Sequence, residues 1–459
     1  MFKEVALNYL NEKRDELIKV SKEIWANPEL GHKEHCASKR IAEILESEGF
    51  DVELGYVNIP TAIKATYGSG SPAIGLLGEY DALPGLSQKV STTEEPIIQG
   101  APGHGCGHNL LGVCKLAAAI AIKEGIKQGD LKGTIVFYGC PAEEQLTGKP
   151  FMARGGAFRD IDMAISWHPA SYNIASYASK TALNSAKFHF KGKTAHAALD
   201  PQNGRSALSA VELMNVGANY LREHVTDDVR IHYVITDGGG APNVVPDKAT
   251  VFYFVRALTR EAVVDTYNRL VKIAEGAAMM TETQLEVELL GGCYNYLVNK
   301  VLVDLSHKVM TETKRPEWTE EELEFAKELN SKTDNYQKTI KAGYAKDGEH
   351  LATDVLPIDE KPRYASNDTG DVSHIVPTCM FMTATQNIGA PGHSWQVVAC
   401  AGHSIGQKGM MYGAECIVGI VDEIFKDPTI LKKAKEEFAE KINGKEYICP
   451  IPDDVPLPY

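Results

Sequence analysis

The chain has 459 residues, 44% of them hydrophobic and 24% charged, which is typical of a soluble globular protein with two domains. The formal net charge of −14 disfavours nucleic acids and anionic membranes as partners. No apolar stretch is long enough to span a bilayer, and the charged N-terminal segment lacks the apolar core of a signal peptide. The nine cysteines are scattered and odd in number, so we expect a cytoplasmic, reducing location.

Helices and strands alternate in the first part of the chain, which favours an α/β layer architecture. From apolar periodicity we expect helices over 2–25 and 38–48 and strands over 62–67 and 73–77. Asp81 follows the last of these strands. It could orient a metal-binding histidine, or it could serve only as a turn residue before Pro84.

His104, Cys106 and His108 occupy alternate positions in the segment GHGCGHNLLG. In an extended segment such side chains point the same way, so the three could converge on one point. Thiolate and imidazole groups are suitable ligands for a borderline transition metal. The alternative is a glycine-rich turn with a free cysteine and two surface histidines. A helix expected over 110–126 would begin beside this segment, where its dipole favours anions.

Glu143 and Glu144 directly follow an apolar run, GTIVFYGC, that is typical of a buried strand. Enzymes with α/β folds place their chemistry at the ends of such strands. Two adjacent acids there could divide the work, one binding a metal ion and the other taking a proton from metal-bound water. A solvated acidic loop is the alternative.

The pattern changes near Ala182, where the predicted order becomes β-α-β-β-α-β, the ferredoxin-like split motif. The predicted elements are a strand from 182, a helix over 206–222, strands over 230–235 and 250–256, a helix over 261–279 and a strand over 284–289. We therefore expect an inserted α+β domain over 182–292. The first domain is then discontinuous, over 1–181 and 293–459.

Seven motifs occur in one order along nearly the whole chain. They are GEYDALPG at Gly78, HGCGHN at His104, PAEE at Pro141, WHP at Trp167, GKTAHA at Gly192, PNVVPD at Pro242 and GAPGHSW at Gly389. With this set the chain resembles the amidohydrolase branch of the M20 metallopeptidase superfamily, and within that branch the p-aminobenzoyl-glutamate hydrolase subgroup. The resemblance implies a zinc-exopeptidase-like α/β/α catalytic domain with a ferredoxin-like lid that serves in dimerisation.

The resemblance also implies the ligands of a metal site and the residues around it. The implied ligands are Cys106, His108, Glu144, His168 and His393. Five ligands exceed what one tetrahedral zinc ion takes, so we expect two divalent ions, manganese or zinc, with Cys106 placed to bridge them. Glu143 would be the general base, and Asp81 would orient a ligand. His168 could instead be an ordinary hydrogen-bonded histidine.

Three residues of the insert are implied to act on the substrate. His196 would reach the active site of the partner subunit and stabilise the developing oxyanion. Asn243 and Arg256 would hold the carboxylate of the substrate. The alternatives are a surface histidine, a turn-forming asparagine and an arginine in a strand salt bridge. Asp368 and Asp371 stand where the family more often has a Glu-Asp pair, and this departure leaves them outside the predicted site.

The function implied is metal-dependent hydrolysis of an N-acyl amino acid, with p-aminobenzoyl-glutamate giving p-aminobenzoate and glutamate. The enzyme would act as a homodimer or as a heteromer with a related subunit. The alternatives are a dipeptidase, an aminoacylase acting on indoleacetyl or acetyl amino acids, or a non-catalytic subunit of a hydrolase complex. Because Glu143 and all five ligand positions are filled, we favour an enzyme.

Overall fold

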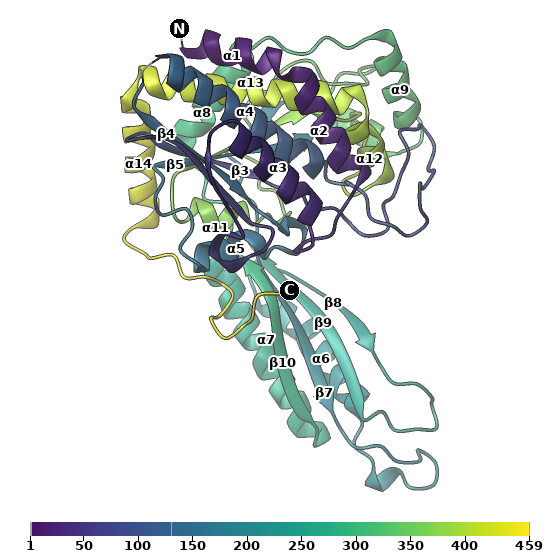
Figure 1. The fold of residues 1–459 in the computed structure, drawn as a ribbon. Helices are drawn as coiled ribbons and strands as arrows, with labels where there is room; N and C mark the ends of the chain where they lie inside the picture. The colour runs from purple at the N-terminus through teal and green to yellow at the C-terminus, as the bar shows by residue number, and fades with distance from the viewer. Residues whose placement is uncertain (1, 130, 459) are drawn as a thin grey trace.

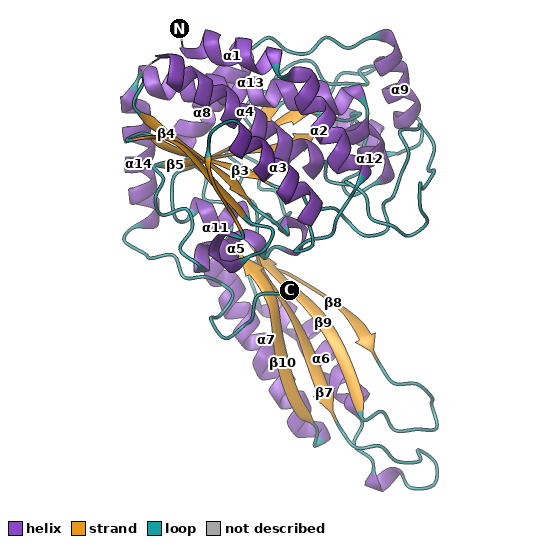
Figure 2. Ribbon diagram, viewed as in Figure 1, coloured by secondary structure: helices purple, strands orange, loops and turns teal. Residues whose placement is uncertain are grey.

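The computed structural model describes residues 2–129 and 131–458; Met1, Asp130 and Tyr459, all within the predicted first domain, lie outside the described residues. Two separate sheets organise the chain (Figures 1 and 2). The larger sheet has seven strands. In spatial order they are β1 (Asp51–Leu54), β2 (Ile63–Ser69), β4 (Gly133–Gly139), β3 (Ala73–Gly78), β5 (Met163–Ala170), β11 (Thr378–Ala384) and β6 (Ile174–Ala175).

The central strands of the seven-stranded sheet run parallel. β3 pairs in parallel with β4 and β5, and β5 pairs in parallel with β11, whereas the outer pairs are antiparallel. Central strands that are covered on both faces are apolar along their whole length, and the residues of β3 and β4 are almost all buried. The carboxyl ends of four parallel strands therefore lie along one edge of the sheet.

Helices of the first domain surround this sheet and cover both of its faces (Figure 2), although not every helix of the domain touches it. They are α1 (Phe2–Glu12), α2 (Arg14–Ala26), α3 (His35–Ser47), α4 (His108–Gly129), α5 (Gly148–Arg154), α8 (Lys300–Glu312), α9 (Glu320–Asn330), α10 (Asn335–Lys341), α11 (Thr369–Ser373), α12 (Trp395–Gly402), α13 (Ser404–Lys426) and α14 (Pro428–Ile442). The alanine-rich α4 is buried from His108 through Ile126. Within 2–129 and 131–458 no helix has both the length and the apolar character needed to cross a bilayer.

The predicted α/β class is confirmed, and the differences concern where elements begin and end. The single helix expected over 2–25 is two helices, because the chain bends at Lys13 between α1 and α2. The helix expected from 110 already starts at His108. Strand β5 extends to Ala170, so His168 lies inside this strand.

The inserted sheet is antiparallel and has four strands, in the order β10 (Gln284–Cys293), β7 (Ala182–Lys191), β9 (Lys248–Ala257) and β8 (Arg230–Asp237). Helices α6 (Ala207–Leu221) and α7 (Arg260–Thr281) pack on one face of it, and together they enclose a second hydrophobic core. The predicted β-α-β-β-α-β order is confirmed.

The strand register fixes which ends of the inserted sheet lie near the larger sheet. Ala182 pairs with Ala257 at the root of the insert, and Lys191 pairs with Lys248 at its far tip. The loops 192–206 and 238–247 both leave from the tip, and Figure 1 shows them far from the helices of the first domain. Residues at the root therefore lie near the first domain of their own chain, and residues at the tip lie far from it.

Candidate metal centre

The carboxyl ends of the parallel strands bring several of the predicted site residues together. Glu79 and Asp81 follow β3, Glu143 and Glu144 follow β4, and His168 lies near the end of β5. His393 lies in the loop between β11 and α12. In an α/β sheet this edge is the usual position of a binding site.

The segment before α4 is a turn, and this corrects one expectation. The Gly107 N–H donates to the carbonyl of His104, and Gly107 itself has a φ of 75°, which favours glycine. Alternation along an extended segment therefore does not apply here. His104 turns away, with its Nε2 3.2 Å from the carbonyl oxygen of Ile24, so the three side chains do not converge. Cys106 and His108 remain together.

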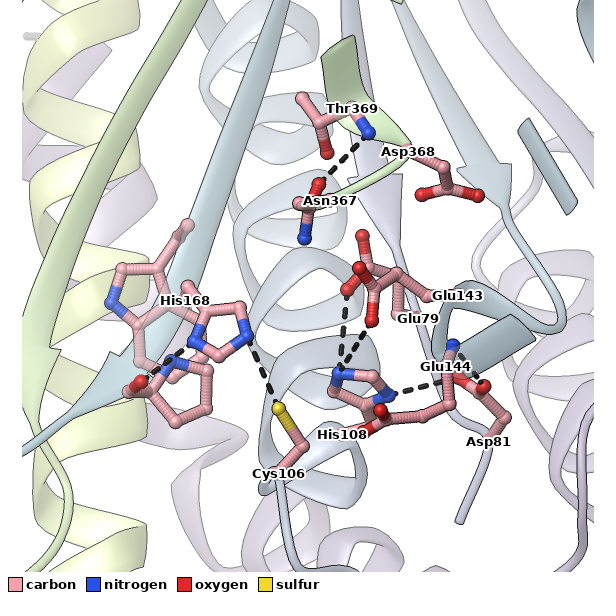
Figure 3. A network of polar contacts seen from close by, with 12 residues as sticks. Glu79, Asp81, Cys106, His108, Glu143, Glu144, His168, Asn367, Asp368 and Thr369 are labelled. Atoms are coloured by element: carbon pink, nitrogen blue, oxygen red, sulfur yellow. Dashed lines mark hydrogen bonds and ion pairs between the residues drawn. The ribbon is translucent and has the colours of Figure 1, made fainter. Parts of the chain in front are cut away.

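Cys106 belongs to two groups of possible metal ligands. In the first, its Sγ lies with nitrogens of His108 and His168; in the second, it lies with Glu144 and His393. The ligand atoms within each group lie within 4.8 Å of one another. Figure 3 shows the Sγ of Cys106 facing His168, at 3.4 Å from its Nε2. The structure thus places the other four predicted ligands around the thiol of Cys106.

Buried His108 and partly buried His168 each have Nδ1 engaged by an oxygen, which leaves Nε2 free for an ion. Nδ1 of His168 lies 2.7 Å from the carbonyl oxygen of Pro169, which can only accept, so Nδ1 carries the proton and Nε2 carries the free lone pair. Nδ1 of His108 is likewise engaged, at 2.8 Å from the carboxylate of Asp81. Burial, followed by the charge of Lys180, lowers the pKa of His168 to about 3, which keeps its ring neutral.

Two of the candidate ligands leave buried polar atoms without a hydrogen bond. Among the described residues neither Nε2 of His108 nor Oε1 of Glu144 has a hydrogen-bond partner. Such atoms are costly to bury and are usually satisfied by a partner or an ion. The set of thiol, imidazole and carboxylate donors fits a divalent transition metal, so these residues fit a metal centre.

A second buried network lies behind Glu143 and was missed in the sequence. Nζ of Lys149 lies 2.6 Å from Glu79 and 2.5 Å from Asp368, and all three side chains are buried. Burial, and then the charges of Glu79, Glu144 and Asp368, raises the pKa of Glu143 well above its usual value. Glu79 stands two residues before Asp81 in GEYDALPG, so its motif could have identified it.

A cavity of about 760 Å³ opens in front of the ligands and reaches the root of the insert. Cys106, Glu143, Glu144, His168 and His393 line it. Its other lining is rich in cationic or protonatable side chains, namely Lys180, Arg230, His232, Arg256 and Arg363. Of these only Arg256 was expected from the sequence. In a chain of net charge −14, this cluster favours an anionic ligand.

His196 and Asn243 lie together at the tip of the insert, away from this cavity. The Ala197 N–H donates to the carbonyl of Asn243 at 3.0 Å, and His196 pairs with Val244. Both His196 and Asn243 are exposed. Arg256 lies instead at the root, where it donates to Ser366. One chain therefore does not bring Asn243 and Arg256 to the same carboxylate.

Comparisons with known proteins show the family and the fold of the chain. Residues 179–279 match the family model of the peptidase dimerisation domain. One of the subunits of the p-aminobenzoyl-glutamate hydrolase of Escherichia coli K12 is 40% identical over 95% of this chain and 94% of its own length. The Xaa-Arg dipeptidase of Mus musculus is 25% identical over 98% of this chain and 94% of its own length. A solved dinuclear metal-binding peptidase of the M20 family from Bacillus subtilis has a similar fold, with a TM-score of 0.54 and 17% identity, covering 90% of this chain and 99% of that chain.

Proposed function

The chain belongs to the M20 peptidase family, and on that premise we propose that it hydrolyses the amide bond of N-acyl amino acids, with p-aminobenzoyl-glutamate as the favoured substrate. The observation that carries this proposal is the thiol of Cys106, which is common to two groups of ligands beside the carboxylate of Glu143. The products would be p-aminobenzoate and glutamate.

Two divalent ions, manganese or zinc, would be held by the five candidate ligands, of which Cys106 is common to both groups. The ligands are Cys106, His108, Glu144, His168 and His393. Bound ions of this kind polarise a carbonyl group and lower the pKa of water. Asp81 orients His108, because its carboxylate fixes the proton on Nδ1.

Glu143 serves as the general base and acid. It lines the cavity and is buried, and its surroundings favour the protonated form more than water does. A carboxylate in this position can take a proton from the attacking water and then deliver it to the leaving nitrogen. The partner subunit's His196 would stabilise the negative charge that develops on the carbonyl oxygen.

The positive charge of the cavity lining favours some candidate substrates over others. Arg256 would hold the α-carboxylate that every N-acyl amino acid carries. A substrate that ends in arginine would place another cation among Lys180, Arg230 and Arg363, which like-charge repulsion disfavours. The cavity therefore supports an acidic substrate over the type named for the dipeptidase relative.

A dimer is required if His196 is to act. The match to a dimerisation domain and the exposed position of His196 at the tip both support this. We favour a homodimer in the cytoplasm, with a heteromer formed with a related chain as the alternative.

The test is metal content and hydrolysis of p-aminobenzoyl-glutamate by the purified protein, beside Glu143→Ala and the surface control Glu53→Ala. We expect about two ions per chain, with turnover lost in Glu143→Ala and retained in Glu53→Ala. Two ions without turnover on p-aminobenzoyl-glutamate, dipeptides and other N-acyl amino acids would indicate a binding subunit. No bound metal after supply of manganese or zinc would overturn the site.

A further inference from the structure

Lys180 and Arg363 lie side by side on the wall of the cavity that belongs to the first domain. The two residues form a parallel bridge, and the Arg363 N–H donates to the carbonyl of Ser179 at 3.0 Å. Both residues line the cavity that holds Cys106 and Glu143. Backbone pairing thus fixes two cationic side chains next to each other beside the site.

Neither side chain has its charge fully matched within the protein. Lys180 is only 9% exposed, and among the described residues no carboxylate forms an ion pair with its ammonium group. Nη2 of Arg363 is buried without a hydrogen bond. Within the described part of the chain its ion-pair partner is Asp359, at 3.7 Å, which already accepts from Ser176 and Tyr344. A buried cation such as that of Lys180 is costly unless an anion pairs with it, whereas the side chain of Arg363 is 25% exposed.

The insert supplies a separate cationic group. Arg230 and Arg256 are directly paired on strands β8 and β9. The guanidinium of Arg256 donates to Ser366 at 2.9 Å, and that of Arg230 lies 5.0 Å from the ring centre of Tyr364. The segment 363–366 thus contributes Arg363 to the pair with Lys180. Its Tyr364 and Ser366 contact the other pair, Arg230 and Arg256.

The pair Lys180 and Arg363 lies on the first domain and the pair Arg230 and Arg256 on the insert, so a substrate with two carboxylates can engage both. An N-acyl amino acid with a neutral side chain has only its α-carboxylate, which we have already assigned to Arg256. We propose that Lys180 and Arg363 bind a second carboxylate, on the side chain of the leaving amino acid, so that the site selects conjugates of acidic amino acids. This inference rests on the proposed hydrolase function and adds the residues that determine specificity.

The recognition follows from charge and geometry. A guanidinium offers two parallel N–H groups to a carboxylate, and the neighbouring ammonium adds a third donor and a second charge. Replacing the side-chain carboxylate by an amide keeps its shape but removes the charge. The amide nitrogen would also face two groups that can only donate, Lys180 and Arg363, and this costs further binding energy.

The test compares p-aminobenzoyl-glutamate with p-aminobenzoyl-glutamine on the metal-loaded enzyme. For the wild type we expect kcat/KM to be higher for the glutamate conjugate by about 30-fold or more. Lys180→Met and Arg363→Met should lower kcat/KM for the glutamate conjugate by about 30-fold, mainly through KM, and change that for the glutamine conjugate by less than about 3-fold. Lys361→Met removes an exposed cation two residues before Arg363 and should change neither value of kcat/KM.

The outcomes separate this inference from the hydrolase proposal. Equal cleavage of both conjugates by the wild type is one contrary outcome, and an equal loss of kcat/KM for both conjugates in the variants is another. In either case Lys180 and Arg363 do not bind a second carboxylate, although the hydrolase proposal stands. If the wild type cleaves no N-acyl amino acid, the hydrolase proposal itself fails. Product inhibition gives an independent readout: glutamate should inhibit the wild type more strongly than glutamine, and Lys180→Met should remove this difference.

Discussion

Asp81 binds His108 with one carboxylate oxygen and the backbone of Glu144 with the other. Oδ1 lies 2.8 Å from Nδ1 of His108, and Oδ2 accepts the Glu144 N–H at 2.9 Å. One buried carboxylate therefore fixes the ring of one candidate ligand and the backbone of another. Because these two ligands come from different groups around Cys106, Asp81 couples the two halves of the proposed centre.

Asp81→Asn should weaken metal binding in both halves. The amide keeps one oxygen for His108, but its nitrogen then faces the Glu144 N–H, and two donors repel each other. Loss of such a supporting group lowers metal affinity by about 10- to 100-fold. Titration of the metal-free protein with manganese should show this shift, and excess metal should restore activity. An unchanged titration curve would contradict the role of Asp81.

Cys106→Ser should lower the number of ions bound, because the thiol is common to both ligand groups. A neutral serine hydroxyl is a much poorer ligand than a thiolate, so we expect fewer than two ions per chain and a loss of activity of at least about 100-fold. Cys36→Ser is the matched control, since Cys36 is exposed and lies outside the cavity. Retention of two ions and full activity in Cys106→Ser would rule out a bridging role.

Lys149→Met should destabilise the protein strongly. The substitution leaves Glu79 and Asp368 buried without their cation, which costs about 3–5 kcal/mol. Lys64→Met removes a partly exposed pair with Asp160 and should cost less than about 1 kcal/mol. Urea unfolding of the metal-free proteins measures both values and separates folding from metal binding. Similar values for the two variants would show that the buried network contributes little.

The sequence predicted those parts of the site that lie beside a strand end or within a distinctive motif. Glu143 and Glu144 follow β4 as expected, because an apolar run of that length must be buried and its end must emerge at the sheet edge. His104 was interpreted wrongly, since alternation holds only for an extended segment, and Gly107 with its positive φ turns the chain there.

Long-range contacts could not be predicted from local patterns. Lys149 and Asp368 are 219 residues apart, and only the fold brings their charges together behind Glu143. Lys180 and Arg363 likewise meet through the pairing of two irregular segments that have no helical or strand periodicity. The charged segment 317–347 supplies Asn330, whose side chain accepts from the Gly389 N–H in the loop of His393.

Asp371 should make stability fall as pH rises from about 4 to 7. Burial raises the pKa of its carboxyl to about 7, against hydrogen bonds from Tyr447 and the Tyr294 N–H. In the unfolded chain the pKa is about 3.9, so the folded state binds the proton more tightly. This stabilisation is fully present below about pH 4 and is lost as pH rises through 7.

Asp371→Asn should therefore become relatively more stable with rising pH. The difference in unfolding free energy, variant minus wild type, should increase between pH 5 and 7 by at most about 1.4 kcal/mol per pH unit. The asparagine oxygen can still accept one of the two hydrogen bonds, so the fold should survive. Urea unfolding of the metal-free proteins at several pH values measures this difference. A difference independent of pH would contradict the raised pKa.

Mixing two inactive variants should restore activity if His196 acts across a dimer. His196→Ala and Glu143→Ala should each inactivate both active sites of their own homodimer. A mixed dimer keeps one intact site, in which Glu143 of one chain meets His196 of the partner subunit. For random exchange of equal amounts, half of the dimers are mixed, so about a quarter of the wild-type activity should return.

The matched control mixes Glu143→Ala with Cys106→Ser. Every site then lacks one residue of its own chain, so this mixture should stay inactive. No recovery in the first mixture, with subunit exchange verified by differently tagged chains, would place His196 outside the partner's site.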